Sequence, residues 1–318
     1  MITIATLVGC AIGDALGNPF EMKPAISPLL TGWDGTFKEG GTFWWGQPGQ
    51  YTDDTLMSMA LTASLLSCNG YNAEDAAKRY LAWMESGNTR GIGGTTAAAL
   101  TRIKLGAHHT ESGLVTNVDG TPVGGNGTAM RASPIGLVYR RNLSKLMEVA
   151  MEDASITHNS LEPKLGSIAV AMGTALIAER YTITKGQNTV MDSPMDALYD
   201  VGGLLPEDSV LRSKFELAIG HLENGTDPAE ALASIGTNGY VPETVGAAFY
   251  CFGATKNFKD CVVMAVRGGG DTDTTAAIAG ALAGTYYGLE GIPEEYKTVE
   301  NFQLLQDLTS ELINVEVE

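Results

Sequence analysis

The chain has 318 residues, of which 44% are hydrophobic and 18% are charged, a composition that excludes a largely disordered protein. Its 37 acidic and 20 basic residues give a net charge of −17. This charge makes nucleic acid an unlikely partner and disfavours anionic membrane surfaces, because both are bound through basic side chains. No linker separates two halves, so we expect one domain over residues 1–318.

Apolar residues recur at helical spacing along most of the chain, which predicts an all-α fold. The stripes predict helices over residues 4–16, 56–65, 76–84, 168–177, 215–222, 245–252 and 278–282. Brief alternating patterns predict two short strands, at residues 42–45 and 114–118.

Three segments lack a clean period and are predicted to be irregular: residues 24–49, 120–127 and 182–205. The first is rich in tryptophan, and its aromatic side chains would either form a lid over a substrate or pack in the core. No uncharged apolar run reaches 18 residues, so no membrane span is expected. The chain start does not resemble a signal peptide, and three of its four cysteines lie in apolar stretches, which indicates free thiols and a cytoplasmic location.

Two similar acidic runs each precede an apolar helical stretch. Residues 52–55 read Thr-Asp-Asp-Thr, and residues 268–275 read Gly-Gly-Gly-Asp-Thr-Asp-Thr-Thr. Helix capping is one explanation, since Asp and Thr are favoured at the N-cap position. A cap needs one such residue, however, and carboxylate and hydroxyl oxygens are also the ligands that Mg²⁺ and Mn²⁺ prefer. From these residues alone, capping and metal binding are about equally good explanations.

Two further acidic residues lie near the chain start. Asp14 falls within the first apolar helix, where a carboxylate is expected to be buried and hydrogen-bonded. Glu21 follows a break at residues 17–19 and by itself indicates a solvated acid on a turn.

A glycine-rich run at residues 124–131 (Gly-Gly-Asn-Gly-Thr-Ala-Met-Arg) is predicted to open a helix, and its backbone N–H groups could receive phosphate oxygens. It matches neither the Rossmann nor the P-loop pattern. His158 precedes a predicted helix and is either structural or a ligand contact. No G-x-S-x-G elbow is present, which argues against a serine hydrolase.

Taken together and in this order, five stretches resemble the ADP-ribosylglycohydrolase family, and in particular its dinitrogenase reductase-activating glycohydrolase branch. They are residues 9–17, 51–55, 125–131, 157–158 and 267–274. The resemblance implies an all-α, single-domain orthogonal bundle around a dinuclear metal centre, which holds two divalent cations, Mg²⁺ or Mn²⁺. It also implies hydrolysis of the glycosidic bond between ADP-ribose and an acceptor, either a protein side chain or a small molecule. This favours the metal reading of the acidic runs over capping.

Carried over residue by residue, the resemblance assigns three groups of site residues. The implied metal ligands are Thr52, Asp53, Asp54, Asp271, Asp273 and Thr274. The implied catalytic carboxylates are Glu21, Asp54 and Asp273. The implied substrate-binding residues are Gly125, Asn126, Gly127, Met130, Ser155 and His158.

One position departs from the family pattern. Arginine-specific members carry Asp-Ile-Gly-x-Thr-Thr, whereas residues 91–96 here read Gly-Ile-Gly-Gly-Thr-Thr. A guanidinium would lose a carboxylate partner at Gly91, which argues against arginine-linked substrates. Two alternatives stay open: a hydrolase of the same fold that acts on another ribosylated or nucleotide-linked small molecule, and a catalytically silent ADP-ribose-binding protein. Retention of all six implied ligands argues against the silent reading.

Overall fold

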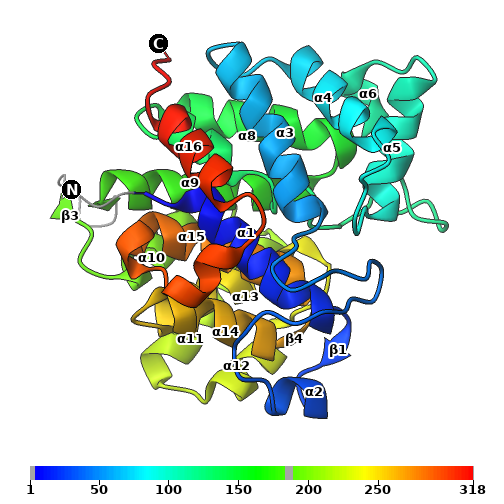
Figure 1. Ribbon diagram of the computed structural model, residues 1–318. Helices are drawn as coiled ribbons and strands as arrows, with labels where there is room; N and C mark the ends of the chain where they lie inside the picture. The colour runs from blue at the N-terminus through cyan, green and yellow to red at the C-terminus, as the bar shows by residue number, and fades with distance from the viewer. Residues whose placement is uncertain (1–3, 183–188, 318) are drawn as a thin grey trace.

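The computed structural model describes residues 4–182 and 189–317 (Figure 1). Over these ranges the chain forms α-helices joined by loops, and each strand is two residues long, so the predicted all-α fold is confirmed. Residues 1–3 and 318 of the predicted domain lie outside the described residues, as do residues 183–188 of the segment predicted to be irregular.

The first half contains α1 (Thr6–Gly17), η1 (Asn18–Phe20), β1 (Lys23–Pro24), α2 (Pro28–Thr31), α3 (Asp53–Ser67), α4 (Ala73–Glu85), α5 (Gly94–Lys104), α6 (His109–Ser112), α7 (Ser133–Val138) and α8 (Leu143–Thr157). The second half contains α9 (Leu161–Glu179), β2 (Tyr181–Thr182), β3 (Thr189–Val190), α10 (Pro194–Leu204), α11 (Val210–Asn224), α12 (Pro228–Ile235), α13 (Val241–Ala254) and α14 (Phe258–Arg267). The remaining elements are β4 (Gly269–Gly270), α15 (Thr272–Tyr287), η2 (Leu289–Gly291), η3 (Glu294–Thr298) and α16 (Phe302–Ile313).

The seven apolar stripes predicted as helices all lie on helices, namely α1, α3, α4, α9, α11, α13 and α15. The two predicted strands were wrong. Each is a loop closed by one isolated bridge, Gly40 with Gly46 and Thr116 with Pro122, because no neighbouring strand among the described residues extends the pairing.

Two other local predictions also need correction. Part of the segment predicted to be irregular is α10, which begins with Pro194 and is capped where Asp196 accepts from the Ser193 N–H at 3.1 Å. The glycine-rich run at residues 124–131 does not open a helix directly. It continues through turns, and α7 begins only at Ser133.

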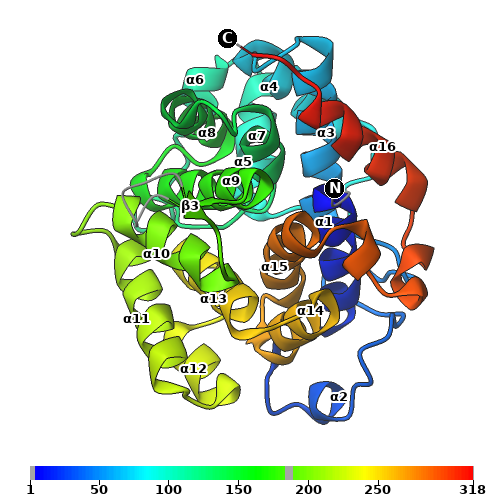
Figure 2. The same ribbon diagram turned by 90° about the vertical axis from the view of Figure 1, so that its left-hand side faces the viewer.

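The α1–α15 pair forms the centre of the molecule, with α3–α8 on one side and α10–α14 on the other (Figures 1 and 2). Every residue of α1 is buried. The two helices approach closely because glycine lies at the contact. A Cβ atom at Gly9 would lie 2.0 Å from the Gly280 carbonyl oxygen, and one at Gly13 would lie 1.9 Å from that of Ala276. This close approach places the end of α1 against the start of α15, where the Thr272 hydroxyl donates to the Gly17 carbonyl at 2.8 Å.

The antiparallel β1–β4 pair joins the segment after α1 to the glycine run before α15. The Met22 N–H donates to the Gly270 carbonyl at 2.6 Å. Gly269 and Gly270 have φ angles of +69° and +73°, a region that favours glycine. A Cβ atom at Gly270 would also lie 2.3 Å from the Thr237 carbonyl oxygen. The glycines of this run are therefore needed to bring the two segments together.

Helix α9 is long and apolar enough to span a membrane by length and composition alone. However, 72% of its most apolar window is buried inside the protein. The core helix of a folded protein passes the same test, so α9 is weak evidence for a membrane span.

Candidate functional site

A cavity of about 400 Å³ opens where the starts of α3 and α15 meet. It is lined by three kinds of segment: the two acidic helix starts with Glu21, the glycine-rich loop with His158, and the corner formed by residues 91–96. Phe43, from the tryptophan-rich segment, also lines it. No Lys or Arg appears among the described residues that line the cavity, so its negative charge has no basic partner there.

The acidic residues of the two runs converge in this cavity although more than two hundred positions separate them. Carboxylate oxygens of Glu21, Asp271 and Asp273 lie within 4.8 Å of one another. Asp53 and Asp54 line the same cavity from the start of α3. Glu21 is half-buried and faces the other acids, so the reading of it as an isolated solvated acid was wrong. The β1–β4 pairing explains its position, because it holds the neighbouring Met22 against the glycine run.

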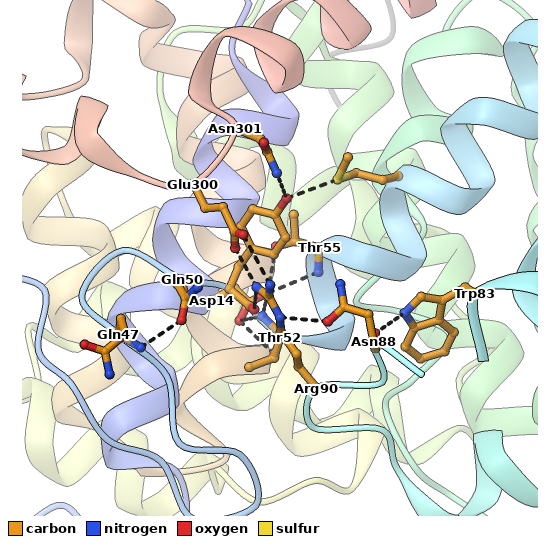
Figure 3. Close-up of polar contacts among 12 residues, drawn as sticks. Asp14, Gln47, Gln50, Thr52, Thr55, Trp83, Asn88, Arg90, Glu300 and Asn301 are labelled. Atoms are coloured by element: carbon orange, nitrogen blue, oxygen red, sulfur yellow. Dashed lines mark hydrogen bonds and ion pairs between the residues drawn. The ribbon is translucent and has the colours of Figure 1, made fainter. Parts of the chain in front are cut away.

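Helix capping does not account for the acidic runs. The N-cap residues Thr52 and Asp271 make no side-chain capping bond to their own helices. Helix α3 is instead capped from α1 by Asp14, whose buried carboxylate accepts from the backbone N–H groups of Thr52 and Thr55 at 2.9–3.1 Å (Figure 3). It also accepts from both threonine hydroxyls, at 2.8 and 2.6 Å. The expectation that Asp14 is buried and hydrogen-bonded is confirmed. The acids of the two runs are only partly hydrogen-bonded: Asp273 accepts from the Thr274 N–H at 3.0 Å, and one oxygen of Asp54 accepts from the Thr52 hydroxyl at 3.2 Å.

Several of these carboxylate oxygens have no partner. Buried Oδ1 atoms of Asp54 and Asp271 accept no hydrogen bond from the described residues. The other oxygen of Asp271 accepts from the Asn126 side chain at 2.9 Å. Buried acceptors without donors are rare because each one costs free energy. Hard oxygen ligands that are buried, clustered and unpaired fit Mg²⁺ or Mn²⁺, which would supply the missing positive charge.

Burial and mutual repulsion raise the pKa values of this cluster. Burial raises the pKa of Glu21 to about 8, and the charges of Asp271, Asp53 and Asp14 add to the shift. Burial, followed by the charge of Asp14, raises the pKa of Asp53 to about 8 as well. Burial also raises the pKa values of Asp54 and Asp273 well above the ordinary value, and the next largest cause is the charge of Asp14 for Asp54 and the charge of Glu21 for Asp273. The cluster therefore resists holding all of its negative charges at once without a cation.

The glycine-rich loop forms another wall of the cavity, with Gly125, Asn126, Gly127 and Met130 lining it. The His158 ring lies against this loop, because a Cβ atom at Gly127 would be 3.0 Å from its Cε1 atom. Burial lowers the pKa of His158 to about 3, and the charge of Arg131 contributes. His158 is therefore neutral at physiological pH and offers a hydrogen-bonding ring rather than a charge.

A buried charged network holds this wall in place. The Arg131 guanidinium is fully buried and pairs with Asp153 at 2.9 Å. It also donates to the Gly127 carbonyl and to the Thr157 hydroxyl, each at 2.9 Å. The Tyr80 hydroxyl donates to the second Asp153 oxygen at 2.8 Å. Arg131 has no predicted role, although a lone arginine between apolar residues signals a buried, paired cation.

The remaining predicted site residues lie in different places. Thr274 lines the cavity, whereas Thr52 is fully buried beside it and its hydroxyl is hydrogen-bonded to Asp14. Ser155 does not line the cavity. Its hydroxyl donates to the Met151 carbonyl within α8 at 2.8 Å.

The Gly91 corner lies directly against the acidic cluster. Gly91 has a φ of +75°, and a Cβ atom there would lie 2.8 Å from Asp53 Oδ1. Phe43 and the Gly91 corner line the same cavity. Phe43 belongs to the segment 24–49, whose aromatic side chains are predicted either to form a lid or to pack in the core.

Comparisons with known proteins identify the family and the fold of this chain. A family model described as ADP-ribosylglycohydrolase matches residues 3–318. The chain is 28% identical to ADP-ribosylarginine hydrolase Tri1 of Pseudomonas putida over 97% of this chain and 76% of that protein. It is 26% identical to ADP-ribosylhydrolase ARH3 of Mus musculus over 97% of this chain and 90% of that protein. A solved structure titled ADP-ribosylglycohydrolase-related protein complex superposes with a TM-score of 0.76 and 26% identity, covering 98% of this chain and 97% of that one.

Proposed function

This chain belongs to the ADP-ribosylglycohydrolase family, and from that premise we propose that it is a metal-dependent hydrolase that releases ADP-ribose from an acceptor. The family and the relatives support ADP-ribosyl hydrolase activity as such. One observation carries the more specific proposal. Acids from two distant helix starts converge beside a glycine-rich loop, and one buried oxygen each of Asp54 and Asp271 lacks a partner among the described residues.

The acidic cluster would hold two divalent cations, Mg²⁺ or Mn²⁺. The ligands that we propose are the residues of the two helix starts: Thr52, Asp53, Asp54, Asp271, Asp273 and Thr274. When bound, the cations supply Lewis acidity and positive charge at the distal ribose of the substrate. The capping of α3 by Asp14 supports this role, because it fixes the start of the helix while Asp54 Oδ1 stays without a partner among the described residues.

The wall formed by the glycine-rich loop and His158 would bind the rest of ADP-ribose. The loop backbone at Gly125 and Gly127 is free of side chains, so a diphosphate can approach it closely. Neutral His158 lines the same wall and can hydrogen-bond without adding charge. The buried Arg131 guanidinium donates a hydrogen bond to the Gly127 carbonyl, which fixes the orientation of the loop before the substrate binds.

Cleavage of the glycosidic bond builds positive charge at the anomeric carbon, and carboxylates close to that carbon stabilise it. Glu21 lies on the cavity wall beside Asp271 and Asp273, so it is placed to stabilise this charge or to move a proton. Loss of the Glu21 carboxylate would therefore lower turnover more than binding of ADP-ribose.

We place the acceptor at the side of the cavity formed by Phe43 and residues 91–96, and call it the acceptor side. This side favours a leaving group without a guanidinium. Position 91 offers no carboxylate, and a side chain there would collide with Asp53 at its current position. Position 91 thus adds no carboxylate partner for a guanidinium. We expect acceptors linked through oxygen to be cleaved better than ADP-ribosyl-arginine.

The test measures release of ADP-ribose from ADP-ribosyl-arginine, ADP-ribosyl-serine, O-acetyl-ADP-ribose and ADP-ribosylated nucleic acid, each with Mg²⁺ and with Mn²⁺. The same assay compares wild type with Asp54→Asn, Asp273→Asn and Glu21→Gln. Full activity in all three variants would reject the proposed site. Tight ADP-ribose binding that needs no metal, without release from any substrate, would instead identify a silent binding protein.

A further inference from the structure

Arg90 lies just behind the cavity and directly precedes Gly91. Its side chain is 14% exposed, and neither Arg90 nor its partner Glu300 lines the cavity. The proposed chemistry therefore does not use this nearly buried ion pair.

The Arg90 guanidinium contacts several separate parts of the chain (Figure 3). It pairs with both carboxylate oxygens of Glu300, at 2.5 and 3.2 Å. It also donates to the Tyr51 carbonyl at 3.2 Å and to the Asn88 side-chain oxygen at 2.9 Å. Its cationic centre lies 4.8 Å from the centre of the Trp44 ring, a cation–π contact.

These partners adjoin the segments that line one side of the cavity. Tyr51 leads into Asp53 at the start of α3, and Trp44 is next to Phe43. Arg90 itself leads into the Gly91 corner. The Glu300 N–H donates to the Gly49 carbonyl at 2.9 Å. This bond fixes the segment before α16, which carries the Glu300 partner of Arg90. The Arg90 side chain thus connects these cavity-lining segments to Glu300.

The arrangement leaves little freedom where the segments meet. Gly91 packs against Asp53 so closely that a Cβ atom would lie 2.8 Å from the carboxylate. The Thr42 hydroxyl donates to the Glu21 carbonyl at 2.5 Å, which ties the loop carrying Phe43 to the acidic cluster. Phe43 is 66% exposed, so its ring is available to a bound molecule. A shift of Arg90 would therefore change the spacing between Phe43 and the Gly91 corner.

We propose that Arg90, held by Glu300, is a positioning residue that sets the width of the acceptor side of the cavity and thereby selects the acceptor. This rests on the proposed function, since it concerns the group released from ADP-ribose. The ADP-ribose side is supported separately, by Arg131 behind the glycine-rich loop. The two sides should therefore respond independently to mutation.

The experiment compares Arg90→Lys, Arg90→Met and Glu300→Gln with wild type on the acceptor panel described above. Lysine keeps the charge but loses the two-pronged contact, so it should rescue only part of the loss in Arg90→Met. We expect kcat/KM for the best acceptor to fall roughly 10- to 100-fold, because a displacement of about 1 Å can cost 100-fold. Its preference over the second-best acceptor should shrink. Binding of free ADP-ribose, measured by calorimetry, should stay within about 2-fold of wild type.

The double variant Arg90→Lys/Glu300→Gln should be little worse than either single variant, since both break one contact. Arg79→Lys is the matched control, because Arg79 pairs with Asp75 on the surface of α4, outside the cavity. It should leave acceptor preference unchanged. Unchanged preference in the Arg90 variants, with only a lower melting temperature, would overturn the proposal and leave Arg90 a purely structural role.

Hydrogen exchange gives a second measurement that does not depend on activity. Arg90→Met should speed exchange over residues 42–46 and 91–96 but not over residues 125–130. Unchanged exchange there would also overturn the positioning role. Wild type inactive on every acceptor would reject the proposed function, whereas active wild type with unaltered variants would reject only the role of Arg90.

Discussion

The acidic cluster at the starts of α3 and α15 and the network around Arg131 are both buried groups of charge next to one cavity. In the Arg131 network each charge has its partner: both oxygens of Asp153 accept, and the guanidinium donates to Asp153, Gly127 and Thr157. In the acidic cluster, oxygens of Asp54 and Asp271 accept nothing from the described residues, and no basic residue lines that wall.

The difference separates two uses of buried charge. A compensated pair stabilises or orients the fold and needs nothing more. An uncompensated cluster costs free energy until a ligand of opposite charge arrives, which is the signature of a binding site. The comparison predicts opposite responses when a charge is removed from each group.

The largest effect is expected from breaking the compensated pair. Arg131→Met leaves Asp153 buried without its cation, and this should lower the free energy of unfolding by about 3–5 kcal/mol. Urea unfolding monitored by circular dichroism measures it. Arg141→Met is the control, since Arg141 is 77% exposed and its pairing with Glu179 should be worth less than about 1 kcal/mol. Equal losses in the two variants would contradict the comparison.

Removing a charge from the acidic cluster should raise stability rather than lower it. Asp273→Asn relieves repulsion, so without divalent cations its melting temperature should rise above that of wild type. Its activity should fall by more than about 100-fold, because even outer partners of metal ligands are worth 10- to 100-fold. Calorimetry in EDTA tests the predicted rise in melting temperature, and turnover with Mg²⁺ or Mn²⁺ tests the predicted loss of activity. A variant both less stable in EDTA and fully active would refute the assignment.

The unpaired oxygens also predict stabilisation by the missing cation. Mg²⁺ or Mn²⁺ at 100 times its Kd should raise the free energy of unfolding of wild type by about 2.7 kcal/mol. The gain should be markedly smaller in Asp273→Asn, whereas Arg141→Met should show the full gain. Thermal unfolding at increasing cation concentration measures this. The same response in wild type and Asp273→Asn would exclude the cluster as the binding site.

The smallest effect on stability concerns His158, whose ring lies against the glycine-rich loop held by Arg131. Burial lowers its pKa to about 3, from an ordinary value of 6.5. As the pH falls, the unfolded chain takes up the proton first, so stability is lost from about pH 7 downward until the folded pKa is reached. The contribution of His158 between pH 7 and pH 5 is about 2 kcal/mol. His158→Gln should lose this part of the pH dependence, whereas His221→Gln on α11 should keep it.

Several features of the site were readable from the sequence because they are local. An acidic pair ahead of an apolar stripe marks the start of a helix, and both α3 and α15 begin at such a pair. The glycine-rich loop at residues 124–127 also lies where its composition predicted a loop. The two predicted strands failed for the complementary reason, since a strand requires a partner that a short alternating pattern cannot specify.

The helical character of the chain and the acidic pairs at two helix starts could be predicted from the sequence, because both depend on neighbours a few positions apart. How these residues are used depends on contacts between distant parts of the chain. The close α1–α15 contact and the β1–β4 pair bring Glu21 to Asp271 and Asp273, and they let Asp14 cap α3 in place of its own acids. Likewise, the Arg131–Asp153 and Arg90–Glu300 ion pairs form only when the whole chain packs. Such contacts join residues up to 250 or more positions apart, and no periodicity encodes distances of that kind.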